Sequence, residues 1–317
     1  MKAIKKIDFV SEINRIKKEK NAIILAHYYQ TGDIQDIADF VGDSLALSQK
    51  AASNNADIIL FAGVKFMAET AKILAPEKKV LLPDINAGCS LADSCKGKDF
   101  KKFIKNNPGR TVITYVNTTA EIKALSDIAC TSSNAVEIVR SLPPEEKIIF
   151  APDRNLGNHI INKTGRDIIV WNGTCHVHEE FSLEAIIKLK ENNPDAKIIA
   201  HPECELPVRM VADFIGSTAA LLNYTTKDFS KKYIVATEPG IIHQMKKSNP
   251  SKTFLDVPPK DSTCGCSECN FMKLITMEKI YRCLKTEKPE ISVNSKIIEK
   301  ARKPIHRMLE ISEKLGL

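Results

Sequence analysis

Side chains that can carry protons recur at equivalent places along the sequence. Three short apolar runs each end in a polar residue, and a second polar residue follows two positions later. These residues are His27, Tyr115 and His201, followed by Tyr29, Asn117 and Glu203. Imidazole, phenol and carboxylate groups act as general acids and bases, and an amide can orient a substrate through hydrogen bonds. The regular spacing, 88 and then 86 residues, predicts that all six side chains face one cleft.

A hydroxyl follows the end of each apolar run after 17 residues. The segment 38–44, ADFVGDS, ends in Ser44 and returns at 212–218 as ADFIGST, which ends in Thr218. A weaker copy at 126–132 ends in Ser132. We expect each hydroxyl to begin a helix, where free backbone N–H groups suit a phosphate or carboxylate. The simpler alternative is that each hydroxyl only caps its helix.

Cysteines follow the last predicted strand of each repeat. They are Cys89, Cys175 and a late group of Cys264, Cys266 and Cys269. Thiolates from three separate segments do not match the local ligand pairs of a zinc finger. They could hold a 4Fe-4S cluster in which one iron has no protein ligand and acts as a Lewis acid. Inert cysteines, and zinc bound by the Cys266-x-x-Cys269 pair, stay open as alternatives.

Short strands and helices in alternation must position these groups. Runs rich in β-branched residues predict strands near 22–27, 57–62, 79–83, 111–116, 147–152, 167–171, 196–201, 233–237 and 253–257. Short apolar strands separated by helices are typical of parallel sheets covered on both faces. In such sheets the chemistry lies beyond the carboxyl ends of the strands, where the polar residues stand.

The repeats divide the chain into three units and a tail. We predict an α/β fold with three homologous parallel-sheet α/β domains, 1–92, 93–179 and 180–270, around a pseudo-threefold axis with a central active site. The remainder, 271–317, should form a helical tail that packs on the body. Its helices are expected at 272–285 and 294–315, with a kink at Pro304 in the second.

The composition excludes some classes of protein and favours others. The 317 residues are 43% hydrophobic and 27% charged, which excludes a disordered chain. No apolar run is long enough for a membrane span, and the basic start does not lead into a signal peptide, so we expect a cytoplasmic protein without membrane partners. The net charge of +7 suits anionic small substrates, whereas the lack of basic blocks interleaved with aromatic residues argues against nucleic acid.

Several motifs together resemble the quinolinate synthases, the iron-sulfur enzymes of de novo NAD biosynthesis. The motifs are AHYYQ at 26–30, GDSL at 42–45, GVKFMAET at 63–70, YVN at 115–117, HVH at 176–178 and HPEC at 201–204. The resemblance covers nearly the whole chain and implies three similar α/β domains around a pseudo-threefold axis. It also implies that iminoaspartate condenses with dihydroxyacetone phosphate to give quinolinate, with loss of phosphate and water. An aspartate-oxidising enzyme would supply the iminoaspartate.

The resemblance also implies roles for single residues. Cys89, Cys175 and one late cysteine would hold the 4Fe-4S cluster, whose open iron would act as the Lewis acid. His27, Ser44, Ser132 and Thr218 would hold the phosphate and carboxylates of the substrates. Tyr29, Tyr115, Asn117, His201 and Glu203 would surround the reacting carbons, with Tyr29, Tyr115, His201 and Glu203 as the catalytic groups. Glu69 and His178 belong to the motifs, but the sequence assigns them no role.

The late cluster ligand has two candidates, Cys264 and Cys269. Adding the repeat spacing to Cys175 leads to 261–263, nearest to Cys264. The resemblance instead matches Cys269, because the family's ligand lies just before a Met-led helix such as 272–276. We expect Cys269 to be the ligand, and Cys266 and Cys269 could form a redox-sensitive disulfide.

The remaining thiols, Cys95, Cys130, Cys204 and Cys283, are expected to be small buried residues. A different class of function, a metal- or redox-sensing module built on the late cysteines, is the alternative to the enzyme. It leaves the regular spacing of His27, Tyr115 and His201 unexplained.

Overall fold

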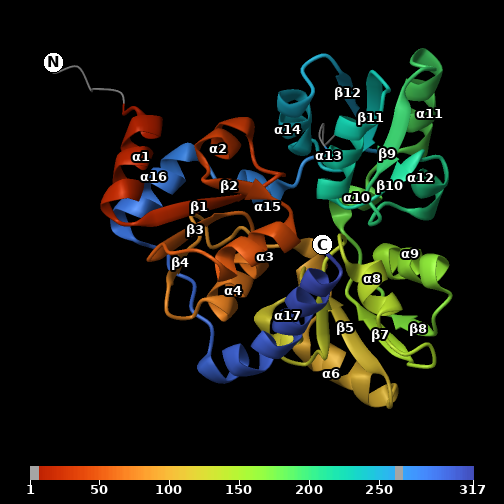
Figure 1. The fold of residues 1–317 in the computed structure, drawn as a ribbon, viewed down its shortest axis with the longest axis horizontal. Coiled ribbons are helices and arrows are strands. Elements are labelled where there is room, and N and C mark those ends of the chain that lie inside the picture. Colours follow the sequence, from red (N-terminus) through yellow and green to blue (C-terminus); the bar gives the residue numbers. More distant parts are fainter. Residues whose placement is uncertain (1–6, 261–266) are drawn as a thin grey trace.

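Three four-stranded parallel sheets form the body of the protein. The computed structural model describes residues 7–260 and 267–317. The strand orders are β2-β1-β3-β4, β6-β5-β7-β8 and β10-β9-β11-β12, so each sheet repeats the same topology. The sheets lie around a common centre, each with its own helices (Figure 1). The predicted fold class, repeated parallel α/β domains, is therefore confirmed.

The order of elements is the same around each sheet. The first sheet and its helices are α1 (Phe9–Glu19), β1 (Ala22–His27), α2 (Gly32–Ile37), β2 (Phe40–Gly42), α3 (Ser44–Ala52), β3 (Ile58–Ala62), α4 (Lys65–Leu74) and β4 (Lys79–Leu81). The second set follows a short helix α5 (Ser90–Asp93) and comprises α6 (Gly97–Asn106), β5 (Thr111–Tyr115), α7 (Ala120–Lys123), β6 (Ile128–Cys130), α8 (Ala135–Arg140), β7 (Ile148–Ala151), α9 (Arg154–Thr164) and β8 (Ile168–Val170). The third set follows α10 (His176–Glu179) and comprises α11 (Leu183–Asn192), β9 (Lys197–Ala200), α12 (Leu206–Met210), β10 (Phe214–Ile215), α13 (Thr218–Lys227), β11 (Lys232–Ala236), α14 (Ile241–Ser248) and β12 (Thr253–Asp256).

One strand of each sheet was not expected from the sequence. The edge strands β2, β6 and β10 lie inside the three copies of the ADFVGDS segment. They are two or three residues long, too short to show the apolar run that identified the other nine strands. The pairing is nevertheless specific, because β1 pairs with β2 through Leu25–Phe40, Ala26–Val41 and His27–Gly42.

The aspartate of the repeated segment explains part of its recurrence. The carboxylate of Asp39 accepts the backbone N–H of Ile24 at 2.7 Å, and Asp213 accepts that of Ile198 at 2.7 Å. Asp127 makes the same contact with Val112 at 2.8 Å. In each unit the aspartate's own N–H also donates to the carbonyl of the same partner residue. This reciprocal pair of bonds fixes the edge strand against the central strand, and thereby sets where the following hydroxyl lies.

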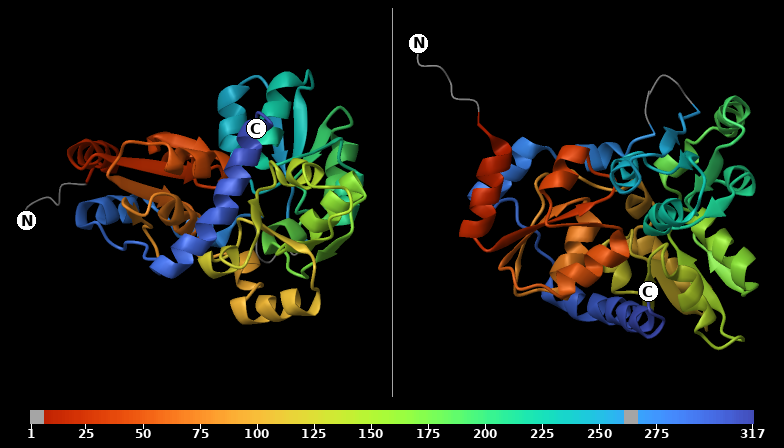
Figure 2. Two further views of the ribbon diagram at one scale, coloured as in Figure 1. Left: turned by 60° about the horizontal axis from the view of Figure 1, so that its bottom comes forward. Right: turned by 45° about the horizontal axis from the view of Figure 1, so that its top comes forward.

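The tail joins the first two sheets. It consists of α15 (Asn270–Lys273), α16 (Met277–Thr286) and α17 (Ser295–Lys314), so the helix expected at 272–285 is divided in two. Helix α16 packs on α1, and α17 lies against α4 of the first unit and α7 and β6 of the second (Figures 1 and 2). Helix α17 continues through Pro304, where the kink is expected.

The apolar cores follow this arrangement. The largest core contains buried residues of the first two units and of the tail, and a smaller core lies within the second unit. The third sheet packs within two further cores. Among the described residues, no helix is both long and apolar enough to cross a bilayer.

The repeated aspartate gives a first prediction. Asp127→Ala removes the acceptor for the N–H of Val112 and should lower the stability of the fold by about 1 kcal/mol, the usual net value of one hydrogen bond. Thermal unfolding of the purified protein measures the change. Asp195→Ala is the control, because Asp195 makes only an exposed ion pair with Lys232. An Asp127→Ala protein no less stable than the control would contradict this role.

Candidate active site

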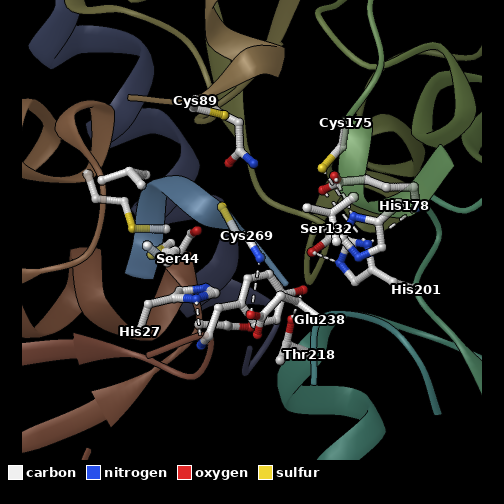
Figure 3. Close-up of a pocket in the computed structure, with 18 of the residues that line it drawn as sticks. His27, Ser44, Cys89, Ser132, Cys175, His178, His201, Thr218, Glu238 and Cys269 are labelled. Atoms are coloured by element: carbon white, nitrogen blue, oxygen red, sulfur yellow. Dashed lines mark hydrogen bonds and ion pairs between the residues drawn. The ribbon is translucent and has the colours of Figure 1, made fainter. Parts of the chain in front are cut away.

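A pocket at the centre of the molecule is lined from all three sheets (Figure 3). Every residue that the sequence analysis assigned to the site contributes to its wall. These residues are His27, Tyr29, Ser44, Cys89, Tyr115, Asn117, Ser132, Cys175, His201, Glu203, Thr218 and Cys269. They lie at or just beyond the carboxyl ends of strands, where ligands bind to parallel α/β sheets.

Two buried imidazoles lie at the ends of the first and third central strands. Nδ1 of His27 accepts the N–H of Tyr29 at 3.2 Å, and Nδ1 of His201 accepts the N–H of Glu203 at 3.3 Å. Burial lowers the pKa of both imidazoles to about 3, so both are neutral. With Nδ1 occupied as an acceptor, the ring proton of each lies on Nε2, and His201 Nε2 lies 3.2 Å from the hydroxyl of Ser132.

Glu203 is a buried carboxylate of the third unit that is held by side chains of the second. The phenol of Tyr115 donates to its Oε1 at 2.6 Å, and Nδ1 of His178 lies 3.2 Å from Oε2. Burial alone would raise the pKa of Glu203, but the neighbouring His178 and His201 and the hydrogen bonds from His178 and Tyr115 lower it to about 2. His178, which the sequence left without a role, therefore orients Glu203, and its Nε2 bonds the hydroxyl of Thr237 at 3.1 Å.

Tyr29 presents its phenol at the junction of the first and third units. The phenol oxygen lies 2.9 Å from the hydroxyls of both Thr218 and Thr237. Its ring meets the ring of His27 edge-on, with 4.4 Å between the ring centres. Burial raises the pKa of Tyr29 well above its ordinary value, and the nearby charge of Glu203 adds to this. The phenol is therefore protonated at neutral pH, beside a carboxylate that is not.

In two of the three units the hydroxyl residue begins its helix without capping it. Ser44 and Thr218 are the first residues of α3 and α13, and the caps are the preceding Asp43 and Ser217, whose side chains accept backbone N–H groups. The capping alternative is thus excluded for Ser44 and Thr218. The prediction that Ser132 begins a helix was wrong, because α8 begins three residues later, at Ala135, although Ser132 does line the pocket.

The turn before α8 has a different function. Its Asn134 side chain accepts the N–H of Thr131 at 2.6 Å, which tightens the turn and leaves Ser132 outside the helix. The next hydroxyl, of Ser133, lies 2.5 Å from the Asp43 carboxylate and 2.8 Å from the Ser217 hydroxyl. These contacts connect the starts of α3 and α13 through the second unit, and so join all three units at one side of the pocket.

Three thiols from separate segments share the pocket. Cys89, Cys175 and Cys269 each directly precede a four-residue helix, α5, α10 and α15. Burial raises the pKa of Cys89 to about 12 and of Cys269 to about 11, and it raises that of Cys175 well above its ordinary value. The order of elements thus favours Cys269 as the third equivalent thiol. Cys264 and Cys266 lie outside the described residues.

The other cysteines that the structure describes, and Glu69, lie outside the pocket wall. Cys95, Cys130, Cys204 and Cys283 are buried, and none of them lines the pocket. Glu69 accepts the N–H of Ala120 at 2.9 Å, which connects the first unit to the start of α7 in the second. Glu69 is therefore a structural link between units.

One pocket residue was missed by the sequence analysis. Glu238 is completely buried and lines the pocket, two residues beyond the end of β11. A signal existed, because Asp153 has the equivalent place two residues beyond β7. The first unit has Val64 there, so the acidic residue recurs in only two repeats and was not noticed.

Comparison with known proteins agrees with this geometry. A family model described as quinolinate synthetase A protein matches residues 11–310. The chain is 58% identical to the quinolinate synthase of Thermosynechococcus vestitus over 96% of each chain. It is 59% identical to that of Synechocystis sp., also over 96% of each chain.

The chain belongs to the quinolinate synthetase A family. A third relative, the quinolinate synthase of Microcystis aeruginosa, is 59% identical over 96% of this chain and 95% of its own. Matches of this length include all three sheets and most of the tail, so the family assignment applies to the complete pocket and not to one of its walls.

The buried Glu203 gives a second prediction. Its pKa lies below the ordinary value of 4.5, so the carboxylate stabilises the fold above about pH 4.5 and this contribution is lost as the pH falls toward 2. Tyr115→Phe removes the phenol donor, so the pKa of Glu203 should rise. The protein should lose about 1.5–3 kcal/mol of stability at pH 7, and less in acid.

Carboxyl NMR titration and urea unfolding at several pH values measure these effects. Tyr281→Phe is the matched control, because the Tyr281 phenol accepts a hydrogen bond from the exposed Lys285 and does not line the pocket. An unchanged pKa of Glu203 in the Tyr115→Phe protein would show that the phenol does not hold the carboxylate.

Proposed function

We propose that the protein is a quinolinate synthase that condenses iminoaspartate with dihydroxyacetone phosphate, releasing phosphate and water. One observation carries the proposal. Three thiols from three segments meet a protonated phenol, a buried carboxylate and neutral imidazoles in a single central pocket. The names of the relatives support the same activity. We further propose that the enzyme works in the cytoplasm and receives iminoaspartate from an aspartate-oxidising enzyme.

The thiol set fits a 4Fe-4S cluster. Cys89, Cys175 and Cys269 would bind three irons, leaving the fourth iron without a protein ligand. Their raised pKa values mean that a nearby cation is needed to make them thiolates, as metal binding does. When bound, the cluster would supply a Lewis acid for a substrate oxygen. Cys175, His178 and Glu203 also have ligand atoms within 4.8 Å of one another, but Glu203 is already engaged by Tyr115.

The substrates are anions, and the pocket offers hydrogen-bond donors for them. Ser44 and Thr218 combine a hydroxyl with the first free N–H groups of α3 and α13, which is a favourable place for phosphate or carboxylate. Nε2–H of His27 and of His201 adds neutral donors. Asn117 lines the pocket, and its buried Oδ1 has no hydrogen-bond partner within residues 7–260 and 267–317. This oxygen can therefore accept a substrate N–H or O–H.

The proton carriers differ in their charge. Tyr29 keeps its proton at neutral pH and can donate it to an oxygen or nitrogen that gains negative charge. Glu203 is ionised and can accept a proton, with Tyr115 and His178 stabilising the carboxylate before and after the transfer. A protonated donor and an ionised acceptor in one pocket are the pair that eliminations and tautomerisations require.

The cluster assignment leads to a third prediction. The anaerobically purified protein should contain about four iron and four sulfide per chain. Cys175→Ala and Cys269→Ala should lose both the cluster and quinolinate formation, since each removes a third of the protein ligands. Cys264→Ala and Cys266→Ala should keep both.

Cys204→Ala is the matched control, because this thiol is buried outside the pocket and bonds the carbonyl of Ala236. A colourless Cys264→Ala protein together with a fully loaded Cys269→Ala protein would transfer the ligand role to Cys264. A colourless parent protein that contains zinc would instead support the metal-sensing alternative.

Tyr29 provides a fourth prediction. Tyr29→Phe keeps the ring and removes only the phenol proton, so kcat should fall by roughly 10²–10⁴ while iron content stays unchanged. Steady-state assays with iminoaspartate and dihydroxyacetone phosphate give kcat and KM separately. Tyr28→Phe is the control, since the neighbouring Tyr28 does not line the pocket. Equal turnover by the two variants would remove the phenol from the reaction.

A further inference from the structure

Glu238 is a buried acidic residue to which the proposed reaction gives no task. It is fully buried and lines the pocket, yet both of its oxygens are already engaged. Oε1 lies 2.8 Å from the ammonium of Lys273 and accepts the N–H of Cys269 at 3.3 Å. Oε2 accepts the N–H of Gly240 at 2.8 Å. A carboxylate with these partners is poorly placed to take a proton from a substrate, so its function must be sought in what it holds.

Lys273 connects Glu238, in the third unit, to the first unit. Its ammonium also donates to the backbone carbonyl of Tyr29 at 2.8 Å. One lysine of α15 thus bonds the first unit at Tyr29 and the third unit at Glu238. Glu238 in turn bonds the N–H of Cys269, the residue just before the same helix. The proton-donating residue and the cluster-binding residue are joined by two side chains.

The backbone around Tyr29 packs closely against the loop that contains Gly240. A Cβ added at Gly240 would lie 2.8 Å from the carbonyl oxygen of Tyr28 and from the carbonyl carbon of Tyr29, so the two loops touch. The buried side chain of Gln35 donates to the carbonyls of Tyr28 and Gly240, at 2.9 Å each. The loop 28–30 is therefore clamped between the loop 237–240 and α15.

The two ends of Tyr29 are fixed by the same loop. Its phenol lies 2.9 Å from the hydroxyl of Thr237, the residue directly before Glu238. Its carbonyl is held by Lys273, the ion-pair partner of Glu238. A shift of the loop 237–240 would therefore move the phenol and the backbone of Tyr29 together.

We propose that Glu238 and Lys273 are positioning residues that fix the phenol of Tyr29 relative to the thiol of Cys269. The inference rests on the proposed function for the roles of Tyr29 and Cys269, whereas the contacts themselves do not. Displacements of about 1 Å can cost roughly 10²-fold in rate, so an ion pair that ties donor and cluster ligand to one frame has a kinetic effect. Fixing the position of Cys269 would also fix α15, which begins at the next residue. It would thereby fix the contact of Lys273 with the carbonyl of Tyr29.

The test replaces Lys273 and keeps the rest of the protein. Lys273→Met should retain the iron and sulfide content of the parent but lower kcat by about 10²-fold, with KM within about twofold. Lys273→Arg keeps a charged donor and should restore part of the lost kcat. Lys279→Met is the matched control, because Lys279 is also in the tail and pairs with Asp84 at 2.6 Å, away from the pocket.

Hydrogen exchange provides a readout that is independent of activity. In Lys273→Met, amide exchange should accelerate in the segments 28–31 and 237–240 and stay unchanged elsewhere. Glu238→Gln keeps the shape of the side chain and should show the same local pattern of exchange. If Lys273→Met does not fold, exchange in Glu238→Gln tests the positioning role. Exchange in both segments equal to that of Lys279→Met, or acceleration across the whole chain, would overturn the proposal.

The two proposals fail separately. If the loaded parent protein makes no quinolinate, the proposed function is wrong, while the exchange comparison still decides whether Lys273 fixes the loop. If the parent is active and Lys273→Met retains full kcat, the positioning role is wrong and the proposed function stands.

Discussion

The burial of one charge, on Glu203, organises the centre of the molecule. A carboxylate removed from water is stable only if hydrogen-bond donors replace its hydration. Here the donors are the phenol of Tyr115 in the second unit and the imidazole of His178 beside Cys175. Tyr115 is on one sheet and Glu203 on another, so the charge cannot be satisfied until two sheets have met. The carboxylate thus couples the arrangement of the units to the chemistry of the pocket.

The titratable side chains around Glu203 are also buried, and burial keeps them neutral. His27 and His201 lose their affinity for a second proton through burial, and Tyr29 holds its proton more strongly. Asp153 is also fully buried, and burial, with the charge of Glu203, raises its pKa well above the ordinary value. Because a second unpaired buried charge would be costly, Glu203 is an ionised acceptor among several neutral groups, and the other acidic residue of the pocket, Glu238, is paired with Lys273. This is a useful arrangement for directing a proton.

The sequence predicted correctly those features that recur in all three repeats. The central strands and the polar residues at their ends were predicted, because apolar runs of four to six residues and a constant spacing are both visible in one sequence. The edge strands β2, β6 and β10 were missed, since two or three residues show no periodicity. Their presence depends on a tertiary bond, such as that from Ile24 to Asp39, which no local pattern displays.

The remaining errors come from places where one repeat departs from the others. Ser132 does not begin α8 because the side chain of Asn134 closes a turn there. Glu238 was overlooked because its partner, Lys273, belongs to the tail and has no counterpart in the repeats. The role of His178 was hidden for a similar reason, since its contact with Glu203 crosses 25 residues of sequence and follows no period.

The position of α17 has a consequence for how the protein is made. This last helix covers α4, α7 and β6, and its Met308, Ile305 and Ala301 belong to the core shared by the first two units. A ribosome makes those two units before the third unit, and it makes the helix that covers them only after the third unit. A nascent chain that ends near residue 290 already contains all the thiols of the site, but its first two units still expose apolar surface. Exposed apolar surface of this kind promotes aggregation, so the two units gain their protection only when α17 has been made and has packed on them.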